Sequence, residues 1–162
     1  MHKSRWNLAL GIGLILAVVL ACNWSASTAN ISSLKVSKDE DGKTEASNFG
    51  PGDKIYAVAI ISNNPGKQSV VFRVLYDDVK GMKSGDMVEG ATKTLEVDGS
   101  RPAVFWITLP PEGFANGRYK FDVVMKNEKG EQKDQKSATF NVAGFSAASA
   151  APAAPAATDE EK

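Results

Sequence analysis

Hydrophobic and polar residues alternate with a period of two along the middle of the chain. The pattern is clearest in residues 119–126, where an apolar row alternates with a row that carries Lys120, Asp122 and Lys126. Successive side chains of a β-strand point to opposite faces, so this segment predicts a strand with its charged row outside. The row predicted to be buried consists of Tyr119, Phe121, Val123 and Met125.

Strand patterns recur through the rest of this region. Residues 137–142 alternate in the same way, which places Phe140 inside, and Asn127–Gly130 fits a hairpin turn before this segment. The segments 54–62 and 104–109 are apolar on both faces, which predicts central strands. The remaining expected strands cover residues 31–38, 70–76 and 92–97.

Turn-forming residues separate these segments, and no stretch sustains a helical period. Glycine, proline, asparagine and aspartate cluster at the breaks, as in Gly50–Asp53, Asn63–Gly66 and Asn116–Gly117. About seven short strands with regular turns predict an all-β fold, a single β-sandwich.

Four motifs carry a family resemblance: Phe49–Tyr56, Pro110–Gly113, Asn116–Tyr119 and Thr139–Val142. Together they resemble the Ig-like sandwiches that are common in exported bacterial proteins. The resemblance covers most of the predicted domain. It implies that the Gly-x-Tyr of Asn116–Tyr119 opens the penultimate strand and that its ring packs near the sandwich corner. It implies an architecture and no activity.

The N-terminus has the organisation of an export signal. A short apolar run, Leu8–Ala21, follows a basic head that contains Lys3 and Arg5. The run is shorter than the roughly 20 residues that a membrane span needs. It ends in Val-Leu-Ala-Cys, which resembles the lipobox of bacterial lipoproteins, although Leu20 is bulkier than the residue usually found there. The resemblance implies cleavage before Cys22 and a lipid on its thiol.

Two alternatives to lipidation stay open. Ser27–Ala29 has the small-x-small pattern of an ordinary cleavage site, which would leave Asn30 as the N-terminus of a soluble periplasmic or secreted protein. The signal would otherwise remain as an uncleaved anchor. The lipoprotein reading places the protein in the cell envelope. The resemblance implies that an aspartate directly after the cysteine often causes retention at the inner membrane. This chain has Asn23 there, which slightly favours the outer membrane.

The chain therefore divides into four expected segments. Residues 1–21 form the signal peptide, or 1–29 if the second cleavage site is used. Residues 22–29 form a tether, and residues 30–145 form the Ig-like domain. Residues 146–162 are rich in alanine and proline and lack large apolar side chains, which predicts a disordered tail.

Composition removes most catalytic chemistry from the expected mature protein. The single histidine, His2, lies in the signal, so no imidazole is left for acid–base work, a nucleophilic triad or zinc. Cys22 is the single cysteine, which rules out an internal disulfide. Lysine plus arginine and aspartate plus glutamate both number 19, and this balance without a basic cluster argues against a nucleic-acid partner. We expect no enzymatic activity and no cofactor.

Two weak site candidates remain. Acidic residues that bracket one loop could converge on a calcium ion, although charged turns are usually only solvated: Asp77, Asp78, Asp86 and Glu89. Trp106 is either a core tryptophan, which the pattern favours, or an exposed platform for a sugar or a partner protein.

These observations favour a non-enzymatic binding or assembly module held at a membrane surface by its lipid. The expected partner is an envelope protein or a glycan. The alternative is a soluble secreted or periplasmic domain with an unrecognised glycan-binding or carboxylate-based enzymatic site. The choice of partner and the oligomeric state stay open.

Overall fold

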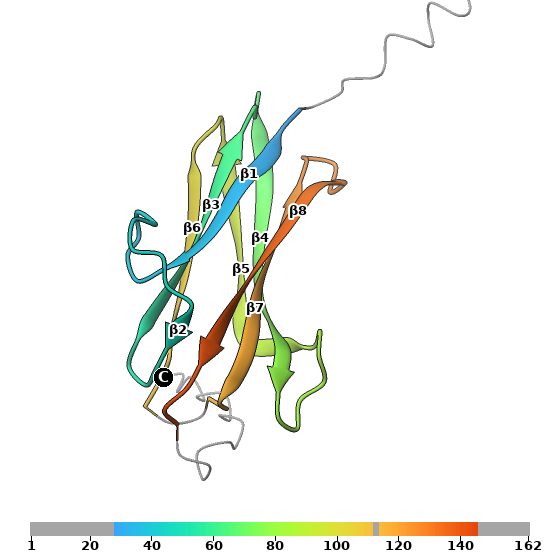
Figure 1. Cartoon of the computed structure of the whole chain (residues 1–162). Coiled ribbons are helices and arrows are strands. Elements are labelled where there is room, and N and C mark those ends of the chain that lie inside the picture. Colours follow the sequence, from blue (N-terminus) through green and yellow to red (C-terminus); the bar gives the residue numbers. More distant parts are fainter. Residues whose placement is uncertain (1–27, 112–113, 146–162) are drawn as a thin grey trace, which may run out of the picture.

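The computed structural model describes residues 28–111 and 114–145, and the regular elements in this part of the chain are all β-strands (Figure 1). The strands are β1 (Asn30–Ser37), β2 (Asn48–Phe49), β3 (Lys54–Ser62), β4 (Lys67–Val79), β5 (Met87–Asp98), β6 (Pro102–Thr108), β7 (Gly117–Lys126) and β8 (Gln132–Val142). The expected signal, Cys22 and the expected tail lie outside the described residues. Within the described ranges, no helix is long and apolar enough to cross a membrane.

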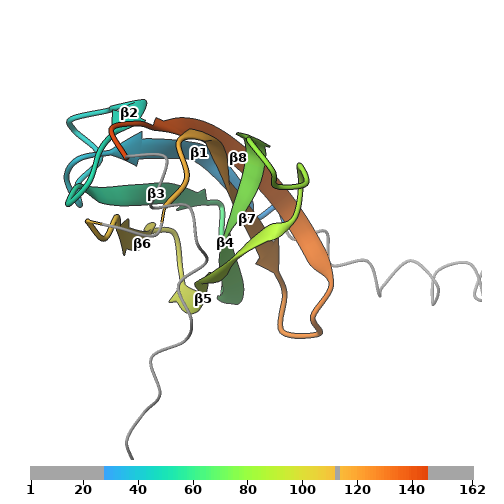
Figure 2. The same cartoon turned by 90° about the horizontal axis from the view of Figure 1, so that it is seen from below.

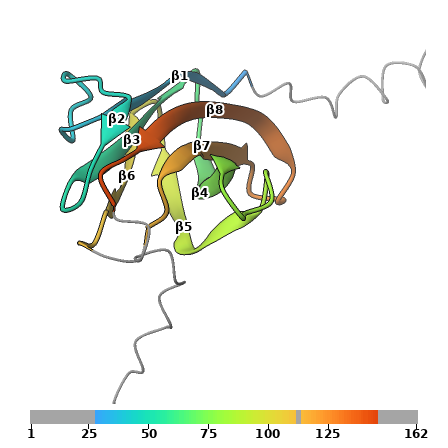
Figure 3. The same ribbon diagram turned by 60° about the horizontal axis from the view of Figure 1, so that its bottom comes forward.

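The strands form two sheets that pack face to face (Figures 2 and 3). One sheet has the order β1-β3-β6 and the other the order β2-β8-β7-β4-β5, with β2 parallel to β8 and all other pairs antiparallel. The chain visits the five-stranded sheet at β2 and returns for β3. It then crosses again between β3 and β4, returns between β5 and β6, and crosses a last time before β7. These crossed connections are those of an Ig-like sandwich, which confirms the predicted fold. The two-residue β2 was missed because a period of two cannot be recognised in so short a segment.

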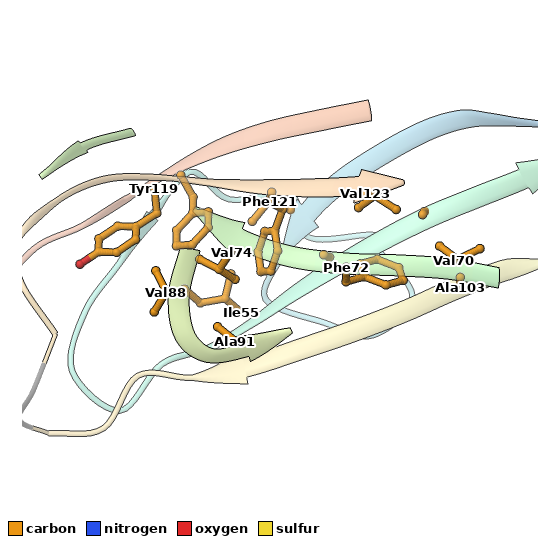
Figure 4. Close-up of a cluster of buried hydrophobic side chains, with 14 of the residues drawn as sticks. Ile55, Val70, Phe72, Val74, Val88, Ala91, Ala103, Tyr119, Phe121 and Val123 are labelled. Atoms are coloured by element: carbon orange, nitrogen blue, oxygen red, sulfur yellow. The ribbon is translucent and has the colours of Figure 1, made fainter. Parts of the chain in front are cut away.

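The core lies between the sheets and contains the rows predicted to be buried. On β7 the four apolar residues from Tyr119 to Met125 are buried, and on the adjacent β4 Val70, Phe72 and Val74 are buried beside them (Figure 4). Phe140 of β8 is also inside, with its ring centroid 5.0 Å from that of Phe121. The predicted inward faces of β7 and β8 are therefore confirmed, and the structure adds the inward face of β4.

The outward row of β7 differs from the prediction, because Asp122 is only 3% exposed. Its strand lies between β4 and β8, whose side chains cover it from both sides. Arg73, the cross-strand partner on β4, forms an ion pair with the Asp122 carboxylate and donates from Nε at 3.1 Å. Gln135 of β8 donates from Nε2 to the other carboxylate oxygen at 2.6 Å. The sequence pattern predicted that the Asp122 carboxylate faces solvent, whereas the sheet buries it between Arg73 and Gln135.

The corner before β7 is fastened by hydrogen bonds. The Tyr119 hydroxyl donates to the carbonyl oxygen of Ala115 at 2.8 Å, which is the tyrosine corner of Ig-like domains. Gly117 has a φ of +151°, and a Cβ at this position would lie 2.6 Å from the carbonyl oxygen of Asp78. The Gly-x-Tyr motif therefore provides both the close approach of two strands and the buried ring that the resemblance implied.

The buried Tyr119 predicts a loss of stability at high pH. Burial, reinforced by the neighbouring Tyr76, raises the pKa of the Tyr119 phenol to about 12, whereas in an unfolded chain it is about 10. As the pH rises from about 10 to about 12, the unfolded state holds fewer protons than the folded state, so stability falls. We expect Tyr119→Phe to cost about 0.5–1.5 kcal/mol at neutral pH and to flatten this alkaline decline. Urea denaturation across the pH series measures both effects. An unchanged alkaline slope in Tyr119→Phe would contradict the assignment, and Tyr76→Phe serves as the comparison variant.

Candidate functional site

The outer face of the three-stranded sheet carries a pair of aromatic rings, of which one is exposed and the other half-buried. Tyr56 of β3 and Trp106 of β6 are directly opposite each other across the sheet, with ring centroids 6.4 Å apart. Trp106 is 52% exposed, so the prediction that it lies in the core is wrong. The alternation along β6 instead turns Phe105 inward, where its ring packs 5.7 Å from that of Phe72. Trp106 must then face solvent.

The strand prediction for this segment also needs correction. β3 lies between β1 and β6 and is the central strand that its two apolar faces predicted. β6 has a similar pattern, but it is an edge strand of the same sheet. Trp106 is exposed because one face of an antiparallel sheet can face water, and its side chain lies on that outer face.

A lysine lies against both rings. The Lys54 Nζ is 5.8 Å from the centroid of Tyr56 and 5.6 Å from that of Trp106. These are distances at which the ring faces attract a cation. In the described part of the chain, Lys54 forms no ion pair with a carboxylate. We call these three residues, Lys54, Tyr56 and Trp106, the aromatic platform.

A groove adjoins the platform on the far side of Trp106. It has a volume of about 280 Å³ and runs between β5 and β6, the edge strands of the two sheets. Its lining is apolar apart from one cation and the indole nitrogen: Lys93, Leu95, Val104, Phe105 and Trp106. The platform and the groove therefore form one continuous surface that combines aromatic and aliphatic groups with two lysines.

The loop between β1 and β2 covers another part of this outer face, at Val58. Gly42, with a φ of +68°, packs on Val58, so that a Cβ at Gly42 would lie 3.4 Å from the Val58 Cβ. The loop is braced by Asp39, whose carboxylate accepts the backbone N–H of Lys43 at 2.9 Å and of Thr44 at 2.6 Å. These hydrogen bonds, that from Lys43 first, lower the pKa of Asp39. Val58 is buried as a result, and the region around Trp106 stays open.

The weak calcium candidates are not brought together. In residues 28–111 and 114–145, no group of three or more histidine, cysteine, aspartate or glutamate side chains could hold a metal ion. Asp77 forms an ion pair with Arg118 of the neighbouring strand, and this pairing raises the pKa of the arginine. Asp78, Asp86 and Glu89 are exposed along β4, its loop and β5. The geometry gives no support to a calcium site at these four residues.

Two other polar features lie away from the platform. Asp122 is the single buried carboxylate among the described residues, and Arg73 and Gln135 occupy it, so it offers no pair of acids for hydrolysis. A hollow of about 360 Å³ lies near the β7–β8 turn, and its two lysines and two glutamates balance each other: it is lined by Lys67, Ser69, Glu96, Lys126, Asn127, Glu128 and Gly130. The platform remains the surface with distinctive chemistry.

The sequence predicted only one of the three platform residues as a candidate. Trp106 was named as a candidate, whereas Lys54 and Tyr56 were placed only in a strand that is apolar on both faces. The sequence signal that could have found them is the alternation of Lys54, Tyr56 and the mirrored Trp106, Thr108. This signal becomes meaningful only when the register of β3 against β6 is known.

Neither a protein-family model nor a curated protein matches this chain. Among solved structures, the alkylpurine DNA glycosylase AlkC of Pseudomonas fluorescens is 16% identical, with a TM-score of 0.47 over 73% of this chain and 31% of that one. A cycloisomaltooligosaccharide glucanotransferase of a Paenibacillus species is 18% identical, with a TM-score of 0.46 over 71% of this chain and 14% of that one. An immunoglobulin-like protein of Pseudomonas aeruginosa is 13% identical, with a TM-score of 0.38 over 74% of this chain and all of that one. The chain spans less than a third of the length of the first two proteins, and these similarities assign it no activity.

Proposed function

We propose that this protein is a non-enzymatic binding module of the bacterial cell envelope. In this proposal an Ig-like domain is held at a membrane, with the outer membrane favoured, by a lipid on Cys22. The observation that carries the binding role is the exposed Trp106 beside Tyr56 on the outer face of a sheet. Tryptophan and tyrosine dominate the energetics of binding surfaces because they bury a large area at a small entropic cost.

The packing of Ala29 supports cleavage before Cys22. Ala29 is only 5% exposed and belongs to the hydrophobic core, directly before β1. Cleavage before Asn30 would remove this core residue from the mature protein, whereas cleavage before Cys22 retains it. The domain therefore gains a packed residue under the lipoprotein reading and loses it under the alternative.

The lipid expected on Cys22 would be sufficient for stable membrane anchoring. The resemblance to bacterial lipoproteins implies three acyl chains on the mature cysteine. Stable anchoring needs about two lipid signals, each buried methylene contributing about 0.8 kcal/mol. The seven residues from Asn23 to Ala29 reach roughly 15 Å as a flexible coil, which would keep the domain close to the membrane surface.

Replacing Cys22 tests the anchor. We expect Cys22→Ser to block processing of the signal or to release the protein from the membrane fraction, while Ser25→Ala leaves both unchanged. Membrane fractionation and intact-mass measurement of the mature chain provide the readouts. A wild-type mature chain that begins at Asn30 and carries no lipid would refute the lipoprotein proposal and favour the soluble alternative.

A further inference from the structure

We propose that the aromatic platform and the adjoining groove bind an acidic glycan, a polysaccharide chain with free carboxylates. This inference deepens the proposed function by naming the chemistry of the partner, and it rests on that function for the location of the domain in the envelope. Three observations carry it: the arrangement of the rings, the charges around them and their position along the domain.

The ring arrangement fits the apolar face of a sugar. Tyr56 and Trp106 are neighbours on two paired strands, so the backbone register fixes their spacing, and their planes are inclined by only 39°. The axial C–H groups of a pyranose ring form a flat apolar patch that packs on such faces. Two adjacent rings on the outer face of a sheet present this surface to consecutive units of an extended chain.

The face of the sheet under the platform offers a partner side chains and no free backbone groups. Tyr56 lies on the central strand, where its neighbours on both sides, Ser37 and Trp106, are already paired with it in the sheet. A partner on this face must therefore be recognised by side chains. A peptide that adds as an extra strand would instead pair with the free edge of β6, beside the platform and not across its face.

The charges select an acidic partner over a cationic one. Lys54 lies against both rings, and Lys93 lines the groove on the opposite side of Trp106. No acidic residue lines the groove. A cationic ligand would be repelled from a site that already holds a lysine over its rings. A carboxylate beside the sugar would instead pair with the Lys54 ammonium and draw this flexible side chain off the ring faces, which frees them for the sugar. Lys93 would add a second charge-assisted hydrogen bond.

The aromatic platform lies far along the domain from the end at which the chain from Cys22 enters. Asn30, where the chain from Cys22 enters the fold, is opposite Ser62 at one end of the sheet. Tyr56 precedes Ser62 by six residues on β3, which corresponds to about 20 Å at 3.3 Å per residue. Figure 1 shows β1 entering at one end of the sandwich and β3 beginning at the other. A polymer outside the membrane can reach this surface more readily than a lipid headgroup can.

The test uses the detergent-solubilised full-length protein and calorimetric titration. The acidic panel is polygalacturonate, alginate, hyaluronate and solubilised peptidoglycan, and the matched neutral probe is methyl-esterified polygalacturonate.

We expect binding to at least one acidic polymer and a weakening of about tenfold or more in Trp106→Ala, the usual loss at a central aromatic contact. Trp106→Phe should retain part of the affinity. Lys54→Gln should reduce binding of the acidic polymer and make the remaining affinity less sensitive to salt. Lys126→Gln, on the other sheet, is the matched control and should bind as the wild type does.

Several results would overturn the inference. These are no binding to any member of the acidic panel, equal affinity for the methyl-esterified polymer, or binding that Trp106→Ala leaves unchanged. A wild-type dimer that Trp106→Ala converts to a monomer, without glycan binding, would assign the surface to a second copy of the chain. Circular dichroism of each variant checks that the fold is retained. The same titration on Cys22→Ser separates the two proposals, because a failed anchor leaves glycan binding intact.

Discussion

Replacing Phe121 with alanine should lower the free energy of unfolding by about 3–5 kcal/mol. Its side chain has no exposed surface and lies at the centre of the core. The ring packs against that of Phe140 at 5.0 Å within its own sheet and against that of Phe105 at 6.2 Å from the opposite sheet. Truncation therefore opens a cavity between the two sheets. Chemical denaturation measures the change, which is a large share of a typical stability of about 5–15 kcal/mol.

Lys120→Ala is the matched control on the same strand. Lys120 precedes Phe121, points to the opposite face and is half-buried, with no ion pair among the described residues. Its loss should change stability by no more than about 0.5 kcal/mol. A Lys120→Ala variant that is less stable than Phe121→Ala would show that the two faces of β7 had been inverted.

Removing the partner of a buried charge should have the second-largest effect. We expect Arg73→Met to destabilise the domain by about 2–4 kcal/mol, because it leaves the buried Asp122 carboxylate with only Gln135 as a side-chain partner. The Arg73 side chain is 34% exposed, so solvent already screens part of the pair and the loss should lie below that of a fully buried one. Urea denaturation of the variant provides the measurement.

A second substitution tests the cause of that loss. Replacing Asp122 with valine in the Arg73→Met background should recover most of the stability, since exchanging both members of a buried ion pair for apolar residues is often neutral. A double-mutant cycle with Asp122→Val alone gives the coupling energy. If the double variant is no more stable than Arg73→Met, the loss comes from the packing of Arg73 rather than from the stranded charge.

The sequence by itself determined the class of fold and the inner faces of its main strands. On β7 and β8 one row is apolar and the other mostly polar, so a period of two allows only one inside face, and Phe121 and Phe140 are inside as predicted. The sequence also predicted the tyrosine corner before β7, because the glycine and the tyrosine of the Gly117–Tyr119 motif each satisfy a local requirement of the backbone.

The sequence could not orient strands with two apolar faces or decide which charges are covered. On β6 both rows carry aromatic or branched residues, and the choice between Phe105 and Trp106 depends on which side of the sheet meets the opposing sheet. Asp122 is buried because β4 and β8 supply Arg73 and Gln135 beside it.

The candidate site could not be predicted from the sequence for the same physical reason. Tyr56 and Trp106 are 50 positions apart, and only the pairing of β3 with β6 places their rings 6.4 Å from each other. Periodicity reports how one strand divides its side chains between two faces. Which face is buried, and which residues of other strands lie beside it, is set by the free energy of packing the sheets together, and this depends on the whole chain.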